Sequence, residues 1–183
     1  MIIILFGAPG VGKGTQATIL AEKLGIAHLS TGDAFRSAIK NGIAVGKLAK
    51  GFVDAGKLVP DEIVARIVKE AMDAPSFKNG CILDGFPRTR AQAETLKTIL
   101  EAHGQKINRV VNITVDDENI IARLLQRGRA DDDETIVRHR LDVYRNETAP
   151  LLDYYGGSER LVSVDGIGSV HEVNERILRA IAA

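Results

Sequence analysis

Residues 2–15 read I-I-I-L-F-G-A-P-G-V-G-K-G-T, and this stretch decides the fold class. The continuous apolar run at positions 2–6 is typical of a short strand that is covered on both faces. A glycine-rich loop follows, and apolar residues then recur at helical spacing from Ala17 to Leu24. The stretch therefore predicts a buried strand, a glycine-rich loop and a helix in direct succession.

The same alternation continues along the chain. Further buried strands are predicted at 80–84, 109–113 and 160–164, with a weaker one at 27–29. Helical patterns lie between and after them, at 61–72, 90–102, 117–126, 133–155 and 170–181. This βαβα order predicts an α/β fold with a mostly parallel sheet and helices on both sides.

Residues 30–60 depart from the alternation. They hold no convincing strand, but two short helical patterns interrupted by glycines. We interpret this segment as a helical excursion from the sheet that is able to move.

The loop after the first strand fits G-x-x-x-x-G-K, except that Gly14 occupies the usual Ser/Thr position and Thr15 follows it. Its glycines let backbone N–H groups turn toward a phosphate, and Lys13 can reach the terminal phosphate oxygens. A plain glycine-rich turn is the alternative. Because strand, loop and helix occur in order, we favour nucleotide phosphate binding.

A second motif, Ile82-Leu83-Asp84-Gly85-Phe86-Pro87-Arg88, ends a strand with a carboxylate. The carboxyl edge of an open parallel sheet is where such proteins bind ligands. Beside a phosphate loop, Asp84 is a natural anchor for hydrated Mg²⁺. The alternative is an Asp that only caps a turn, and we favour the functional interpretation.

Arginines gather between positions 123 and 145. Arg140 falls within an apolar helical stripe and is expected to be paired, because an uncompensated buried charge costs several kcal/mol. Pairing with the acidic run at 131–134 is an even alternative for Arg123 and Arg145, and we disfavour it for Arg127, Arg129 and Arg140. Arg138 points away as a surface charge, and the acidic run itself is expected to begin a helix.

Two sites match capping boxes, Ser30 to Asp33 and Thr89 to Gln92, so helix physics alone assigns Thr31, Asp33 and Gln92 to helix starts. The four histidines have no ligand spacing and receive no metal or catalytic role. Cys81, the single cysteine, is expected to be a buried small hydrophobe.

Composition limits the class of protein. With 183 residues, of which 45% are hydrophobic, the chain is expected to form one domain with a real core. Twenty-four basic and twenty-four acidic residues argue against a broad nucleic-acid surface. No apolar run is long enough for a membrane span, and positions 1–6 lack the pattern of a signal peptide. One cysteine excludes an internal disulfide and a cysteine-rich zinc site, so we expect a cytoplasmic protein.

These motifs together resemble the adenylate kinase family, over nearly the whole chain and in order. The string Asp-Gly-Phe-Pro-Arg at 84–88 is the most specific of them. The resemblance implies a P-loop NTPase-type three-layer fold with a five-stranded parallel sheet over residues 1–183, an NMP-binding insertion at 30–59 and a short lid at 127–133. Only Gly128 separates Arg127 from Arg129, whereas long-lid members carry about 30 residues there and sometimes four zinc-binding cysteines. The chain is thus similar to the short-lid, bacterial type, with no zinc.

The resemblance also implies site residues. ATP would be held by Gly10, Val11, Gly12, Lys13, Gly14, Thr15, Arg123, Arg127 and Gly168. AMP would be held by Thr31, Arg36, Lys57, Leu58, Val59, Gly85, Phe86, Pro87, Arg88, Gln92, Arg129 and Arg140, which overrides the capping interpretation of Thr31 and Gln92. The catalytic set would be Lys13, Arg88, Arg127, Arg129 and Arg140, with Mg²⁺ near Asp84.

The implied reaction is ATP + AMP = 2 ADP, with ATP, AMP and ADP as partners, neither nucleic acid nor membrane, and a monomer. A UMP/CMP kinase of the same family is the enzymatic alternative, although Thr31 favours AMP. A P-loop nucleotide sensor is the non-enzymatic alternative, which the second phosphate-facing set around Arg36 and Arg88 argues against.

Overall fold

The computed structural model describes residues 1–129, 132–157 and 160–182. Five strands form one sheet, in the order β2-β3-β1-β4-β5, and every pairing is parallel. The strands are β1 (Ile2–Phe6), β2 (Ala27–Ser30), β3 (Cys81–Asp84), β4 (Ile107–Thr114) and β5 (Leu161–Asp165). The predicted α/β class, with a five-stranded parallel sheet, is confirmed.

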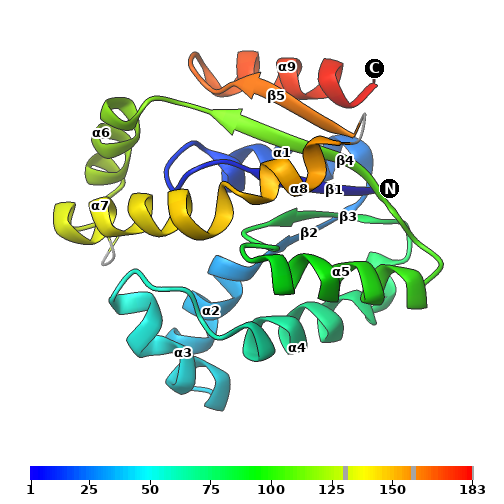
Figure 1. The fold of residues 1–183 in the computed structure, drawn as a ribbon, viewed down its shortest axis with the longest axis horizontal. Coiled ribbons are helices and arrows are strands. Elements are labelled where there is room, and N and C mark those ends of the chain that lie inside the picture. Colours follow the sequence, from blue (N-terminus) through cyan, green and yellow to red (C-terminus); the bar gives the residue numbers. More distant parts are fainter. Residues whose placement is uncertain (130–131, 158–159, 183) are drawn as a thin grey trace.

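Helices cover both faces of the sheet (Figure 1). On one face, α4 (Asp61–Met72), α5 (Arg90–Ala102) and α8 (Leu151–Gly156) pack against the strands. On the other face lie α1 (Lys13–Leu24) and α9 (Val170–Ala182). The helices α6 (Asp117–Arg127) and α7 (Glu134–Val143) lie beyond the carboxyl ends of the strands and contribute to the same hydrophobic cluster. A short 3₁₀ turn, η1 (Pro75–Phe77), leads into β3.

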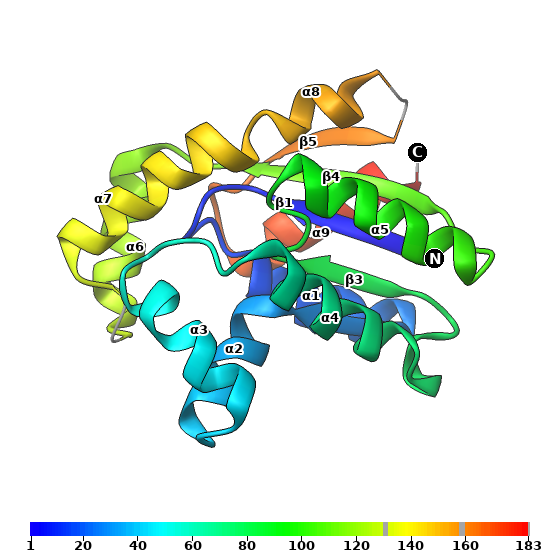
Figure 2. The same ribbon diagram turned by 60° about the horizontal axis from the view of Figure 1, so that its bottom comes forward.

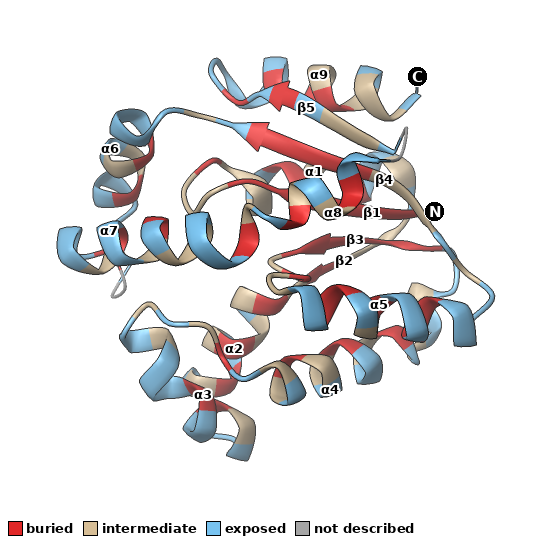
Figure 3. Cartoon of the chain, in the orientation of Figure 1, coloured by how far each residue is buried: buried red, intermediate tan, exposed pale blue. Residues whose placement is uncertain are grey.

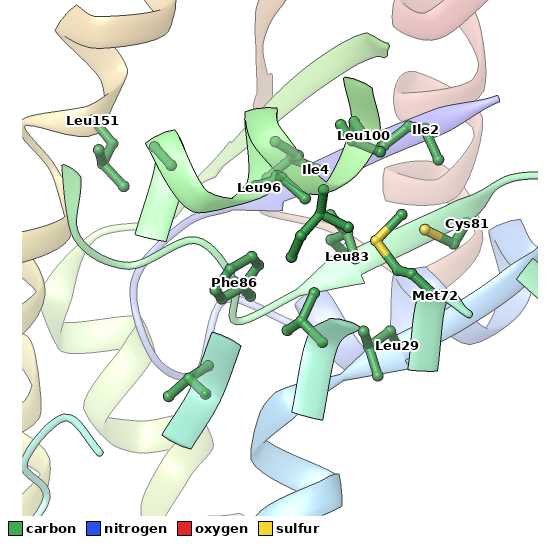
Figure 4. Packing of buried hydrophobic residues seen from close by; sticks show 14 of the residues in the cluster. Ile2, Ile4, Leu29, Met72, Cys81, Leu83, Phe86, Leu96, Leu100 and Leu151 are labelled. Carbon is green, nitrogen blue, oxygen red and sulfur yellow. The ribbon is translucent and has the colours of Figure 1, made fainter. Parts of the chain in front are cut away.

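Two hydrophobic clusters hold these layers together. The central strands β1 and β3 are red along their whole length in Figure 3, because their alternate side chains enter the two clusters. In the larger cluster, Phe86 lies just beyond β3 and packs with Leu83, Leu96 and their neighbours (Figure 4). Cys81 is fully buried in β3, as predicted.

The excursion at 30–60 forms two helices, α2 (Thr31–Lys40) and α3 (Ala44–Asp54), between β2 and α4. Figures 1 and 2 show both standing off the sheet, at the end where α6 and α7 lie on the other side. Because all strands are parallel, this is the end where every strand releases its following loop. The helices therefore flank the edge at which a ligand site is expected.

The prediction of one continuous helix at 133–155 is wrong. The segment 133–155 is divided into α7, a π-helical turn η2 (Tyr144–Thr148) and α8. Pro150 lacks the N–H needed to continue the helix, and the turn closes with Ala149 N donating to Tyr144 O at 2.8 Å. The widened turn directs Thr148 inward, where its Oγ1 donates to Arg88 O at 3.0 Å.

A second prediction fails at the sheet edge. The strand predicted at 160–164 as buried is β5, in which only Val164 is buried and Ser163 and Asp165 are exposed. β5 pairs with β4 alone, so its outer edge and part of its face meet solvent. Among the helices of the described residues, none has both the length and the apolar character of a bilayer crossing.

Candidate active site

The glycine-rich loop lies between β1 and α1, as predicted. Half-buried Lys13 folds back over it, and Nζ donates to Gly7 O at 2.7 Å and Ala8 O at 3.0 Å. Burial lowers the pKa of Lys13 to about 8; nearby Asp84 opposes the shift, and Arg88, Arg140 and Arg127 reinforce it. The ammonium is thus short of negative partners, which is the condition in which an anionic ligand binds well.

Asp84 ends β3 beside this loop, and it is 8% exposed. Its Oδ2 lies 3.9 Å from His28 Nε2, which is itself buried and makes no hydrogen bond with the described residues. Burial alone would raise the pKa of Asp84, but His28, Lys13 and Arg88 outweigh it and hold that pKa below its usual range. Asp84 therefore stays a carboxylate at neutral pH.

The donor set near Asp84 limits which metal it can hold. Among the described residues, no three His, Cys, Asp or Glu side chains converge as metal ligands. A single carboxylate suits Mg²⁺, which keeps several waters and takes its other ligands from substrate phosphates. A Cβ added at Gly14 would lie 3.4 Å from Asp84 Oδ2, so the residue that replaces the usual Ser/Thr leaves this carboxylate room.

The loop Gly85 to Arg88 closes the site on the side of α2. Gly85 has φ 79°, and its carbonyl accepts from Thr31 Oγ1 and from Arg88 Nε, both at 2.9 Å. A Cβ at Gly85 would lie 2.9 Å from both the Thr31 hydroxyl and the Arg88 guanidinium, so a larger residue there displaces one of them. The Phe86–Pro87 peptide is cis. Burial lowers the pKa of Arg88; Asp84 opposes this, and Arg140 and Arg36 add to it.

Gln92 lies at the start of α5 and is 2% exposed. Its Oε1 accepts from Arg88 N at 2.7 Å, and its Nε2 donates to Asp61 Oδ1 at 2.7 Å. Thr89 caps the helix by accepting from Gln92 N at 3.2 Å, so half of the predicted capping box exists. The Gln92 side chain does not return to the cap residue, and it joins α4 to the Arg88 loop instead.

Ser30 likewise caps α2 by accepting from Asp33 N at 3.3 Å. The Asp33 carboxylate does not complete the box, because it accepts from Arg36 Nη2 at 2.5 Å. Burial would raise the pKa of Asp33, but Arg36 and Ser30 lower it overall. Thr31, which helix physics assigned to the helix start alone, holds Gly85 across the site.

Arginines of α6 and α7 meet at Asp132, whose side chain is 1% exposed. Arg127 binds it through two nitrogens, at 2.8 and 2.5 Å, and Arg140 Nη1 lies 3.6 Å from it. Arg129 donates its backbone N–H to Asp132 at 3.0 Å. Pairing with the acidic run, which we disfavoured, is therefore present for Arg127 and Arg140, whereas Arg129 contacts Asp132 through its backbone. The physical reason is that Asp133 and Glu134 begin α7, which leaves Asp132 turned inward.

Three further arginines of this region, Arg123, Arg145 and Arg138, have other partners. Arg123 Nη2 donates to Gly166 O at 3.2 Å and forms no ion pair with residues 132–134, the described part of the acidic run. Arg145 pairs with Asp117 and Asp142 on the surface. Arg138 is exposed and pairs with Glu134 on its own helix, as predicted for a surface charge.

One cavity of about 360 Å³ brings most of the predicted residues together. Its lining includes Gly10, Gly12, Lys13, Gly14, Thr15, Thr31, Arg36, Lys57, Leu58, Val59, Asp84, Gly85, Pro87, Arg88, Gln92, Arg123, Arg127, Arg129 and Arg140. Three predicted residues are not among the lining: Val11 and Phe86 are buried in the two hydrophobic clusters, and Gly168 lies on the loop after β5. Any contact they make with a ligand in the cavity would have to come from the backbone or after a movement.

Comparison with known proteins supplies the family. The sequence model of the family described as adenylate kinase matches residues 5–160. Proteins named adenylate kinase from Corynebacterium glutamicum (strain R) and Rhodococcus erythropolis (strain PR4) are 49% and 50% identical to this chain over 181 residues. The alignments cover 99% of this chain and of each relative, and a Nocardia farcinica adenylate kinase is 48% identical over the same length. The chain belongs to the adenylate kinase family. The resemblance to adenylate kinases is thereby confirmed over the full chain.

Sequence reasoning about this adenylate kinase missed two carboxylates that organise its cavity. Asp61 was interpreted only as a helix start, yet it holds both Gln92 and Thr89. Asp132 was interpreted as part of a helix terminus, yet it holds Arg127 and Arg140. Neither has a local sequence signal, apart from Asp61 following Pro60 and Asp132 standing one residue before a helix cap.

Proposed function

We propose that the chain catalyses reversible transfer of the γ-phosphoryl group of ATP to AMP, which gives two ADP, within the single cavity described above. The observation that carries this proposal is the convergence of Lys13, Arg88 and the Arg127–Arg140 pair on that cavity from separate segments. A protein that only sensed one nucleotide would not need a second set of phosphate-facing cations around Arg36 and Arg88.

Direct transfer needs little covalent chemistry from the protein. An oxygen of the AMP phosphate forms a bond to the γ-phosphorus, and the bond from that phosphorus to the bridging oxygen of ATP breaks, which leaves ADP on both sides. The accepting phosphate is largely ionised at neutral pH, since its second pKa is about 6. No general base is therefore required, and catalysis rests on positioning and on neutralising charge in the transition state.

We assign the residue roles from the family resemblance together with the residues that line the cavity. We place the ATP phosphates on Gly10 to Thr15, with Arg123 and Arg127 on the same side, and adenine of ATP near Gly168. We place AMP between Thr31, Arg36, Lys57 to Val59, Gly85 to Arg88 and Gln92. We place Arg129 and Arg140 where the two phosphate chains would meet, so the proposed catalytic set is Lys13, Arg88, Arg127, Arg129 and Arg140.

Asp84 would hold Mg²⁺ through water, beside Lys13 and Gly14. The ion would neutralise charge on the ATP phosphates. Asp84 itself stays ionised and in place because of its charged neighbours, and this is the contribution that the protein makes.

Two segments are proposed to close over the nucleotides and exclude water, which would otherwise accept the phosphoryl group. The first is the NMP-binding insertion at 30–59, which comprises α2 and α3. The second is the short lid at 127–133, of which Ala130 and Asp131 lie outside the described residues. With so short a lid, we expect the insertion to carry much of the movement.

All of these residues come from one chain, so a monomer suffices, and gel filtration tests that prediction. The function itself is tested by a coupled assay that compares AMP, CMP, UMP and GMP as acceptors of phosphate from ATP. AMP should be preferred. A preference for UMP or CMP would favour the pyrimidine kinase alternative, and turnover of none would favour a sensor.

Two variants test the site in the same assay. Arg88→Ala should lower turnover by about 10²–10³-fold with an unchanged Tm, because one transition-state cation is lost. Lys13→Met should abolish transfer. Arg138→Ala is the matched control, since this exposed arginine pairs with Glu134 on its own helix and should leave turnover unchanged. Near-normal turnover of Arg88→Ala would remove Arg88 from the mechanism.

A further inference from the structure

Asp61 and Gln92 form a contact that no motif suggested. Asp61 is the first residue of α4, and its two carboxylate oxygens accept from Gln92 Nε2 at 2.7 Å and from Thr89 Oγ1 at 2.8 Å. Both donors belong to the start of α5, which follows the Arg88 loop. The carboxylate therefore fixes a glutamine that lines the cavity.

The orientation of the Gln92 amide is determined uniquely by its two partners. A backbone N–H can only donate, so the atom facing Arg88 N must be the oxygen Oε1. A carboxylate can only accept, so the atom facing Asp61 must be the nitrogen Nε2. Turning the amide over would set N–H against N–H and oxygen against oxygen, and two buried contacts would be lost.

The amide still has capacity for a ligand. An amide nitrogen carries two hydrogens and an amide oxygen two lone pairs, and the contacts of Gln92 with the described residues use one of each. Gln92 can therefore present one donor beside one acceptor, in a fixed order. An amide held in this order can distinguish purine bases, because adenine carries an N6 donor where hypoxanthine and guanine carry an O6 acceptor.

We propose that Asp61 is a positioning residue that sets the base preference of the acceptor site by holding the Gln92 amide in one orientation. This inference rests on the proposed placement of AMP against Gln92. A site whose buried polar groups match one base rejects a base with the reverse pattern, because the groups would be left unpaired. Asp61 acts through Gln92 and touches no substrate.

The experiment compares kcat/KM for AMP with kcat/KM for IMP, with ATP as the donor. IMP has the same ribose phosphate as AMP but an O6 acceptor and an N1 donor. Asp61→Ala removes the anchor and should lower the AMP:IMP ratio by about tenfold. Asp61→Asn keeps the shape with a weaker neutral acceptor, and it can also turn its own amide donor toward Gln92, so a fall of about threefold is expected.

Glu62→Gln is the matched control. Glu62 is exposed in the same first turn of α4, so its replacement removes the same charge from the same helix end without touching Gln92. The AMP:IMP ratio of this variant should equal that of the wild type. Melting temperatures of all variants show whether each one still folds. If Asp61 were merely structural, its replacement would lower kcat/KM for AMP and for IMP together and leave the AMP:IMP ratio unchanged.

Gln92→Ala separates a failure of the proposed function from a failure of the inference about Asp61. If the wild type does not phosphorylate AMP, the proposed function fails. If it does, but Gln92→Ala leaves the ratio unchanged, the base does not lie against Gln92 and the inference fails with that placement. If Gln92→Ala lowers the ratio but both Asp61 variants keep it, only the positioning role of Asp61 is overturned. Should Asp61→Ala fail to fold, Asp61→Asn decides the question alone.

Discussion

Arg127 and Asp132 form a two-nitrogen ion pair, at 2.8 and 2.5 Å, in which the Asp132 side chain is nearly inaccessible and the Arg127 side chain is 31% exposed. Burial would raise the pKa of Asp132, but Arg127, the Arg129 backbone N–H and Arg140 hold it below its usual range. The pair joins the end of α6 to the start of α7 and supplies Arg140 with its counter-charge.

Replacing Asp132 with Asn should destabilise the chain by about 2 kcal/mol, because two partly buried guanidiniums lose their counter-charge. Thermal unfolding measures this loss. Added tripolyphosphate should raise the Tm of the variant more than that of the wild type, since phosphate oxygens can replace the missing carboxylate. Asp142→Asn is the control, because the Asp142 side chain is 63% exposed and pairs with Arg145 on the surface. Equal stabilities of the two variants would contradict a structural role for the Asp132 pair.

Nucleotide binding should take up a proton above neutral pH. The pKa of Lys13 is about 8 in the free protein, and polyphosphate favours the ammonium and raises it. At pH 8 the uptake should approach about half a proton, and it should fade toward pH 6. Calorimetric titrations in buffers of different ionisation enthalpy measure it. Lys13→Arg keeps its charge at every pH used, so uptake that persists in this variant would assign the proton to another group.

The same shift has a consequence for stability. Between the folded pKa of about 8 and the ordinary value of about 10.4, the unfolded chain binds more protons at Lys13 than the folded chain does. The contribution of Lys13 to the free energy of unfolding therefore rises with pH across this window. Denaturant unfolding at pH 7 and pH 9 should show the free energy of unfolding of the wild type rising relative to that of Lys13→Met between the two pH values.

A buried polar chain joins α1 to α9. Gln16 Nε2 donates to Val170 O at 2.9 Å, Asn174 Nδ2 donates to Gln16 Oε1 at 3.0 Å, and Lys23 Nζ donates to Asn174 Oδ1 at 2.8 Å. Asn174→Ala leaves the Gln16 oxygen buried and unpaired, which should cost about 2–3 kcal/mol. Urea unfolding measures this cost. Glu175→Ala, at the next and partly exposed position, should change stability by less than about 1 kcal/mol.

The Cys81 thiol should be inert in the folded chain. It is fully buried, and burial raises its pKa to about 12, so almost no thiolate forms at neutral pH. A colorimetric disulfide reagent should react with it only after denaturation. Rapid labelling of the native protein would show that β3 opens locally.

The phosphate loop and the Asp84–Arg88 loop could be predicted because each combines a local motif with a preceding strand. The order of helices and strands could be predicted from hydrophobic periodicity, which is also a local signal in the sequence. The contact between Asp61 and Gln92 could not be predicted, since it joins residues 31 positions apart through side chains with ordinary helix-start roles. The division of 133–155 has a local signal in Pro150, but the π-helical turn that brings Thr148 to Arg88 O has none, because that contact is tertiary.

Gly46 on α3 lies so close to the α2 backbone that a Cβ there would come within 2.2 Å of the Ala38 carbonyl. No side chain fits between the two helices at this point, so they cannot slide past one another without parting. Residues 31–54 must then move as one rigid body about the two segments that connect them to the rest of the chain. Backbone amides of α2 and α3 should accordingly lose or keep their hydrogen-exchange protection together, as a single cooperative unit.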